Sequence, residues 1–79
     1  MRADVCDPRN APAVQRFRAT LRSLGAEVAE KYWGIGVNHY RLKIAGETLS
    51  IFADAWSVDI DGPDALVERV LREFENTRA

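Results

Sequence analysis

The spacing of apolar residues changes twice along this chain, and these two changes restrict the folds that the chain can adopt. Apolar residues recur at helical spacing in residues 11–24, alternate with polar residues from about 26 to 54, and return to helical spacing in residues 63–76. A period near 3.6 indicates an amphipathic helix, whereas a period of two indicates a strand with one buried face. The sequence therefore predicts a helix, a set of strands and a second helix.

The first helix is expected from Ala11 to Leu24. Asn10 can cap its first turn, Pro12 lies where its missing N–H does no harm, and Gly25 follows its end. Its apolar stripe consists of Val14, Phe17, Leu21 and Leu24. The arginines on its other faces are expected to be solvated, namely Arg16, Arg18 and Arg22.

The second helix is expected from Pro63 to Asn76. The segment "DGP" leads into it, and Asp64 lies near the positive end of its dipole. The residues predicted to face the core are Leu66, Val67, Val70, Leu71 and Phe74.

Turn chemistry suggests the register of the last predicted hairpin. A two-residue turn of Gly46 and Glu47, with glycine first, suits type II′. This turn would pair Ile44 with Leu49 and Leu42 with Ile51. The turn and the alternation agree on one buried face, made of Leu42, Ile44, Leu49 and Ile51.

A three-residue loop, Gly34 to Gly36, would join the preceding pair of strands. It pairs Trp33 with Val37, and it leaves Glu30 on the buried side beside Tyr40. That position is tolerable for a carboxylate only if the strand lies at an edge.

The alternation slips by one residue after Asp54, which indicates either a bulge or a short fourth strand. The predicted fold class is α+β: a two-layer α-β-β-β-α sandwich whose antiparallel three-stranded sheet carries both helices on one face. Residues 1–79 are expected to form a single small domain, with residues 1–10 as a flexible N-terminal segment.

Composition narrows the class of protein. The 79 residues hold 47% hydrophobic and 29% charged residues, with no apolar run near the roughly 18 residues of a membrane span. The polar start "MRADVCDPRN" does not resemble a targeting segment, so a cytoplasmic protein is expected. Cys6 is the only cysteine, so an internal disulfide is excluded.

Charge is divided between the two halves of the chain. Residues 1–43 carry eight Lys/Arg and four Asp/Glu, whereas residues 44–79 carry three and eight. The formal net charge of −1 gives little long-range attraction for nucleic acid, so a nucleic-acid partner is not expected.

The face of the sheet away from the helices is the predicted binding surface. In the proposed registers His39 stands opposite Asp54, Arg41 lies beside Phe52, and Trp33 adds a second aromatic side chain. An uncovered face with such side chains is often covered by a partner or by a second copy. These five residues are the predicted protein-binding site.

No complete catalytic set accompanies His39. An adjacent carboxylate can orient an imidazole, but no nucleophile and no second acid are clearly placed, so an enzyme is not expected. The spacing of the acidic cluster does not match a calcium loop, and "GIG" is too short for a phosphate loop. No metal and no cofactor are therefore predicted; the cluster is Asp54, Asp59, Asp61 and Asp64.

The predicted order of elements is similar to that of double-stranded-RNA-binding domains and of HicA-type mRNA-cleaving toxins. The segment "GIGVNHY" also places a histidine after a glycine-containing turn, as those toxins do. Val37 and Asn38 precede His39, so the toxins' glycine–serine–histidine pattern is not matched, and their basic character is missing. The resemblance implies that His39 would be the catalytic residue if this chain were such a toxin, but we assign no family.

Three hypotheses for function follow. The first is a small cytoplasmic, non-enzymatic interaction or accessory domain, such as a toxin-neutralising protein, that binds a protein partner through the open sheet face. The second is an RNA-binding module or HicA-like toxin using His39 and nearby cations. The third is a domain that only self-associates by pairing the faces or edges of two copies.

Overall fold

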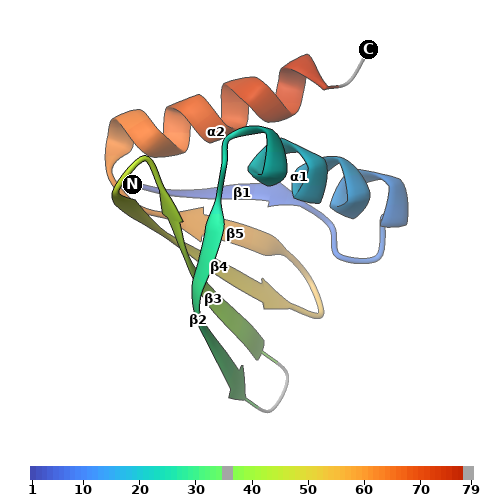
Figure 1. Ribbon diagram of the computed structural model, residues 1–79. Coiled ribbons are helices and arrows are strands. Elements are labelled where there is room, and N and C mark those ends of the chain that lie inside the picture. The colour runs from blue at the N-terminus through green and yellow to red at the C-terminus, as the bar shows by residue number, and fades with distance from the viewer. Residues whose placement is uncertain (35–36, 78–79) are drawn as a thin grey trace.

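In the residues that the structure describes, the chain forms five strands and two helices (Figure 1). The computed structural model describes residues 1–34 and 37–77, with the side chains at positions 32–37 outside that description. The elements in chain order are β1 (Arg2–Cys6), α1 (Ala11–Ser23), β2 (Glu27–Gly34), β3 (Val37–Ile44), β4 (Glu47–Asp54), β5 (Val58–Asp61) and α2 (Asp64–Asn76).

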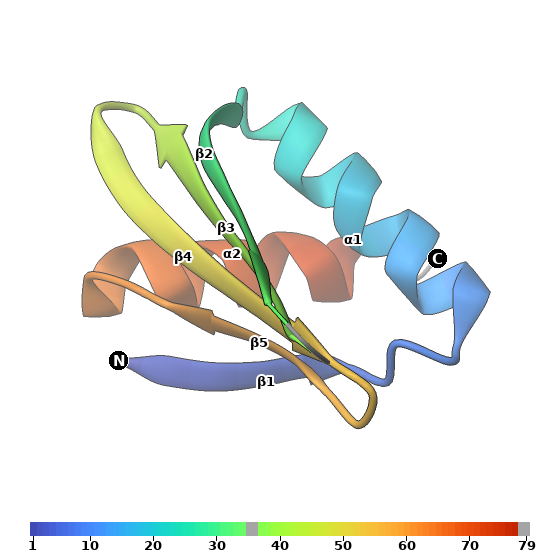
Figure 2. The ribbon, with the colours of Figure 1, turned by 90° about the horizontal axis from the view of Figure 1, so that it is seen from below.

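The strands form one antiparallel sheet in the order β1-β5-β4-β3-β2. Both helices lie on the same side of this twisted sheet (Figures 1 and 2). The prediction of an α+β fold is confirmed, but the prediction of a three-stranded sheet is wrong because strands β1 and β5 extend it to five.

Strand β5 is one of the two alternatives predicted for the slip after Asp54. The chain reverses there, and β5 pairs with β4 with Ile51 opposite Ile60. Val58 and Ile60 are buried, so β5 adds two side chains to the core.

Strand β1 lies within the segment predicted to be flexible, residues 1–10. It pairs with β5, with Ala3 opposite Ile60, and the N–H of Gly62 donates to the carbonyl of Met1 at 3.1 Å. Ala3 and Val5 pack against the core. The free edge of the short strand β5 therefore has a partner from the start of the chain.

The β3–β4 turn differs from the predicted one. Ala45 and Gly46 have φ angles of 52° and 83°, and positive φ at both central positions defines a type I′ turn. Leu42 therefore pairs with Leu49, a shift of two residues from the expected register. A shift of two keeps each side chain on its face, so the predicted buried face is confirmed.

A bulge at Ala29 changes the register of β2 against β3. Val28 pairs with Leu42 as predicted, but beyond the bulge Glu30 pairs with Arg41. The extra residue reverses the alternation, so Glu30 no longer shares the helix side with Tyr40. The bulge thus removes the conflict visible in the sequence.

Helix α1 begins at Ala11 as predicted and ends at Ser23, one residue before the predicted end at Leu24. The Asn10 side chain accepts a hydrogen bond from the N–H of Ala13 at 3.2 Å. At the other end Gly25 has φ 74°, its N–H donates to the Arg22 carbonyl, and the N–H of Ala26 donates to the Leu21 carbonyl. These two bonds form a Schellman motif, which explains why the helix ends there.

The buried face of α1 is rotated from the predicted stripe. Its buried residues are Ala13, Phe17 and Thr20, whereas Val14 and Leu21 are only partly buried. The Phe17 ring meets the Phe74 ring of α2 edge-on, with centroids 6.2 Å apart. Part of the apolar stripe of α1 therefore remains available at the surface.

Arg16 also departs from the prediction of a solvated side chain. Its guanidinium donates to the Phe74 carbonyl at 3.1 Å and lies 4.4 Å from the centroid of the Phe74 ring. Arg16 therefore joins α1 to the end of α2, while Arg18 and Arg22 are exposed.

Helix α2 packs through the predicted residues, of which Leu66, Val67, Val70 and Phe74 are buried and Leu71 is partly buried. Pro63 occupies its N-cap position and Asp64 lies in its first turn. Among the described residues, no helix is both long and apolar enough to cross a lipid bilayer.

Candidate functional site

The sheet face opposite the helices carries polar and aromatic side chains from all five strands. Strand alternation places these residues there because their neighbours along each strand point into the core. In the part of this face whose side chains are described, the residues include Arg2, Asp4, Glu27, Glu30, His39, Arg41, Lys43, Thr48, Ser50, Phe52, Asp59 and Asp61. We call this surface the open sheet face.

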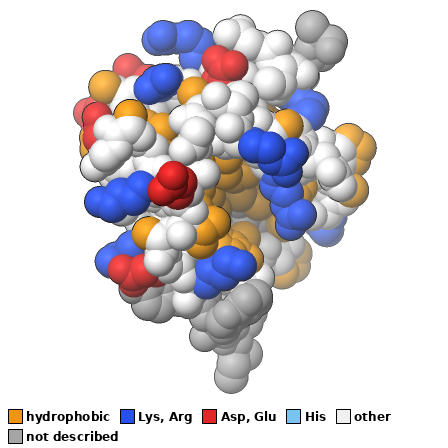
Figure 3. Space-filling model, viewed as in Figure 1, with side chains coloured by type: hydrophobic (Ala, Val, Ile, Leu, Met, Phe, Trp, Pro, Cys, Tyr) orange, Lys and Arg blue, Asp and Glu red, His pale blue; other side chains and the backbone are white. Residues whose placement is uncertain are grey.

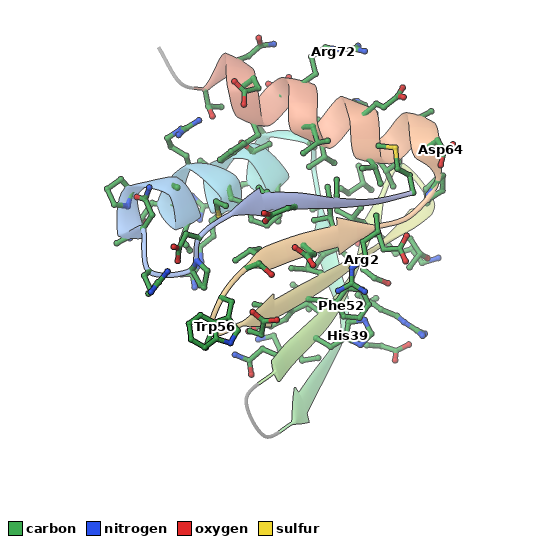
Figure 4. The ribbon with its side chains drawn as sticks, turned by 180° about the vertical axis from the view of Figure 1, so that it is seen from behind. Arg2, His39, Phe52, Trp56, Asp64 and Arg72 are labelled. Carbon is green, nitrogen blue, oxygen red and sulfur yellow. The ribbon has the colours of Figure 1, made fainter. Side chains whose placement is uncertain are left out.

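The Phe52 ring lies at the centre of the open sheet face, on β4. His39 of β3 is its cross-strand partner, and the two rings stack with centroids 4.3 Å apart and planes 19° apart. The Arg2 guanidinium from β1 lies over the same ring, 4.5 Å from its centroid (Figure 4). We call Arg2, Phe52 and His39 the aromatic stack, and it joins the first strand of the chain to the middle of the sheet.

An ion pair fixes one end of the aromatic stack. The guanidinium of Arg2 donates to a carboxylate oxygen of Asp59 at 3.2 Å, and Asp59 is the cross-strand partner of Phe52 on β5. A guanidinium held by both a carboxylate and a ring loses less entropy when a partner binds. The ion pair and the ring contact together fix where the Arg2 side chain lies on this face.

Arg41 does not lie beside Phe52 as predicted. The type I′ turn places Ser50 opposite Arg41, and the bulge at Ala29 brings Glu30 to its other side. The Arg41 and Glu30 side chains form an ion pair at 3.9 Å, with about half of each side chain exposed. The cation that meets Phe52 is instead Arg2, which the sequence prediction left in a flexible segment.

Asp54 does not stand opposite His39, because the register pairs it with Val37. Its carboxylate accepts hydrogen bonds from the N–H groups of Trp56 and Ser57, at 2.7 and 2.8 Å. These two bonds lower the pKa of Asp54, and the bond from Trp56 has the larger effect. Asp54 therefore organises the β4–β5 loop, and the predicted cross-strand pairing of His39 with Asp54 is wrong.

Trp33 is paired with Asn38, one residue away from the predicted partner Val37. The side chain of Trp33, which the sequence prediction places in the binding site, falls outside the described side chains.

Trp56 is an exposed aromatic residue that the sequence prediction did not select. It lies in the β4–β5 loop, apart from the aromatic stack (Figure 4), and 75% of its surface is exposed. The Arg9 guanidinium lies 6.0 Å from the centroid of its ring. The signal in the sequence was the loop "DAWS", where a tryptophan follows an aspartate that can hold a tight turn.

The chemistry available around His39 is limited. Its cross-strand partners are Phe52 on β4 and Tyr32 on β2, neither of which is an acidic residue or an activated nucleophile. In residues 1–34 and 37–77 no three metal-ligating side chains come together as a metal site would need. The arrangement is suited to surface recognition through stacking and ion pairs.

Comparisons with protein-family models, with curated proteins and with solved structures gave no match for this chain. The fold and the surface define it as an α+β domain with an uncovered antiparallel sheet face and an aromatic stack at its centre.

Proposed function

We propose that the chain is a small non-enzymatic domain that binds a protein partner, or a second copy of itself, through the open sheet face. The observation that carries this proposal is the aromatic stack at the centre of that face. Aromatic and arginine side chains at the centre of a surface commonly dominate the energy of protein interfaces. The ion pairs around the stack supply a polar rim that can fix the orientation of a partner.

An RNA-binding role for the same face, including a toxin that uses His39, is less well supported. Asp59 and Asp61 on the same face would repel phosphates. Proteins offer complementary charges of both signs, so they suit this mixed surface better.

The cytoplasm is the compartment that we propose for this activity. Cys6 has no second cysteine with which to form a disulfide inside the chain, and proteins of oxidising compartments commonly rely on disulfides when they are this small.

The experiment compares Phe52→Ser with the wild type in affinity capture from the native host and in sedimentation over a range of concentrations. We expect loss of the captured partner, or of self-association, because a hot-spot truncation typically costs about 2 kcal/mol or more, a loss of about thirtyfold in affinity. Arg72→Ser is the matched control, since Arg72 is exposed on α2, away from the open sheet face (Figure 4).

Arg41→Glu is a second variant, which keeps the proposal testable if Phe52→Ser fails to fold. Arg41 is exposed and its ion pair with Glu30 is long, so circular dichroism should show an intact fold. Normal binding by both Phe52→Ser and Arg41→Glu would refute the proposal. RNA binding that falls steeply with salt and is lost in Arg41→Glu would replace it with the RNA role.

A further inference from the structure

A second surface lies on the helix side of the sheet, between α1 and the strands β2 and β3. It is a groove of about 620 Å³, and Figure 3 shows it as a hollow with hydrophobic side chains in its floor. The floor includes Phe17 and Leu21 from α1 and Tyr40 and Leu42 from β3. The groove is therefore separate from the open sheet face.

The groove exists because α1 does not cover the sheet as far as its edge. Val28 of β2 points to the helix side, yet 57% of its surface is exposed. Val14 and Leu21 are also only partly buried, since the rotation of α1 turns Thr20 into the core in their place. The protein thus leaves apolar side chains uncovered along the length of one helix and one strand.

The groove is lined by charges of one sign. Its lining contains Arg18 and Arg22 from α1 and Lys31 from β2, and no acidic residue among the described residues. Arg18 and Arg22 are four residues apart, so they share one side of α1. None of these three cations forms an ion pair with a carboxylate in the described part of the chain.

We propose that this groove binds an acidic amphipathic α-helix of a partner protein. The apolar stripe of that helix would lie on Phe17, Leu21 and Tyr40, and its flanking carboxylates would meet the cations on the two walls. An amphipathic helix docks through residues at i, i+3, i+4 and i+7, and its charged residues stand on both sides of that stripe. A long-chain carboxylate fits the groove less well than an acidic helix. It has a single anionic end, so it would leave one of the two basic walls without a matching charge.

This proposal goes beyond the role of the open sheet face and concerns a different surface. Phe52→Ser tests the sheet face, whereas substitutions at Arg18 and Arg22 test the groove. The failure of one proposal is therefore distinguishable from the failure of the other.

The probe is an acetylated, amidated peptide of about 18 residues, long enough to form a helix in water, built from leucine, alanine and glutamate. Leucine occupies the i, i+3, i+4 and i+7 positions, and glutamate flanks them on both sides. A control peptide has lysine in place of every glutamate. Binding is followed by the methyl resonances of isotope-labelled protein during titration with each peptide.

We expect the acidic peptide to shift the methyl groups of Leu21, Val28 and Leu42 and to leave those of Thr48 on β4 and Ala65 on α2, which do not line the groove, unaffected. The double variant Arg18→Glu, Arg22→Glu should weaken binding by about tenfold or more, because two attractive pairs become repulsive. Arg69→Glu with Arg72→Glu on the exposed side of α2 is the matched control and should bind as the wild type does.

Three results would overturn the proposal. They are no binding of the acidic peptide, equal binding of the acidic and basic peptides, and unchanged affinity in the Arg18→Glu, Arg22→Glu variant. Methyl shifts in the groove caused by monomeric laurate, with no response to the acidic peptide, would assign the groove to long-chain carboxylates instead.

Discussion

The β3–β4 turn provides a sharp test of the strand register, because the two candidate registers predict opposite effects of one substitution. In the structure Ala45 occupies the first central position of a type I′ turn with φ 52°, a left-handed conformation that alanine rarely adopts. In the register with Gly46 and Glu47 at the centre, Ala45 would be the last residue of a strand. Ala45→Asn separates the two, since asparagine favours the turn and disfavours a strand.

The size of the effect follows from the backbone conformation. A residue with a Cβ in the left-handed region costs roughly 1–2 kcal/mol, and asparagine reduces that cost through its short polar side chain. Ala45 is exposed, so little packing is lost or gained. We expect Ala45→Asn to stabilise the protein by about 0.5–1 kcal/mol, which raises Tm by about 2–8 °C in a domain of this size.

The measurement is urea unfolding at 25 °C, followed by circular dichroism, with thermal unfolding as a second probe. Ala45→Val is the companion variant, and a β-branched side chain at positive φ should destabilise the protein by about 1 kcal/mol or more. Glu47→Asn is the control, since Glu47 pairs with Ile44 outside the turn and should gain nothing. Stabilisation by Ala45→Val and destabilisation by Ala45→Asn would refute the type I′ turn.

Three further substitutions test the core, the β4–β5 loop and the entry to α2. Leu49 has no exposed surface, so Leu49→Ala should cost about 2–5 kcal/mol in urea unfolding, and a change within about 0.5 kcal/mol would contradict its burial. The lowered pKa of Asp54 stabilises the fold above the ordinary carboxyl pKa of about 3.9, and this contribution is lost as pH falls through the folded-state value. Asp54→Ala should therefore make unfolding free energy less sensitive to acid below about pH 4, and an unchanged acid profile would count against the loop bonds. A Cβ at Gly62 would lie 3.1 Å from the Thr48 carbonyl oxygen, so Gly62→Ala should destabilise the protein by about 1 kcal/mol, and a neutral result would show that the backbone there yields.

The sequence predicted which face of each strand is buried more accurately than it predicted which residues pair across neighbouring strands. Alternation of apolar and polar residues decides which side chains are buried, and a register error of two residues leaves that decision unchanged. The turn was mispredicted because glycine followed by glutamate suits type II′, whereas the observed turn places Ala45 in a conformation that local preference disfavours. The pairing of whole strands can override a cost of this size.

Strand β1 and the aromatic stack depend on contacts between distant parts of the chain. Five residues with three apolar side chains, Ala3, Val5 and Cys6, carry too short a pattern to predict a strand. Their partner β5 lies more than fifty residues away, and only the folded sheet brings Arg2 over Phe52. His39 and Phe52 were predicted to share a face, but their direct stacking followed from the corrected register.

The bulge at Ala29 had a signal in the sequence that could have been used. With no bulge Glu30 would have faced the core beside Tyr40, and an unpaired carboxylate in that place is costly. One extra residue in the strand moves Glu30 to the open sheet face, where it meets Arg41. A conflict between alternation and burial is thus itself a reason to predict a bulge.

Photocrosslinking in living cells tests the proposal that the open sheet face is a protein-binding surface. A benzophenone amino acid replaces Ser50, which lies on the open sheet face beside the aromatic stack, or Arg72, which lies on the exposed side of α2. We expect irradiation to join the Ser50 position to a discrete protein or to a second copy of the chain, and the Arg72 position to give no such product. Crosslinking from Arg72 with none from Ser50 would contradict the proposal.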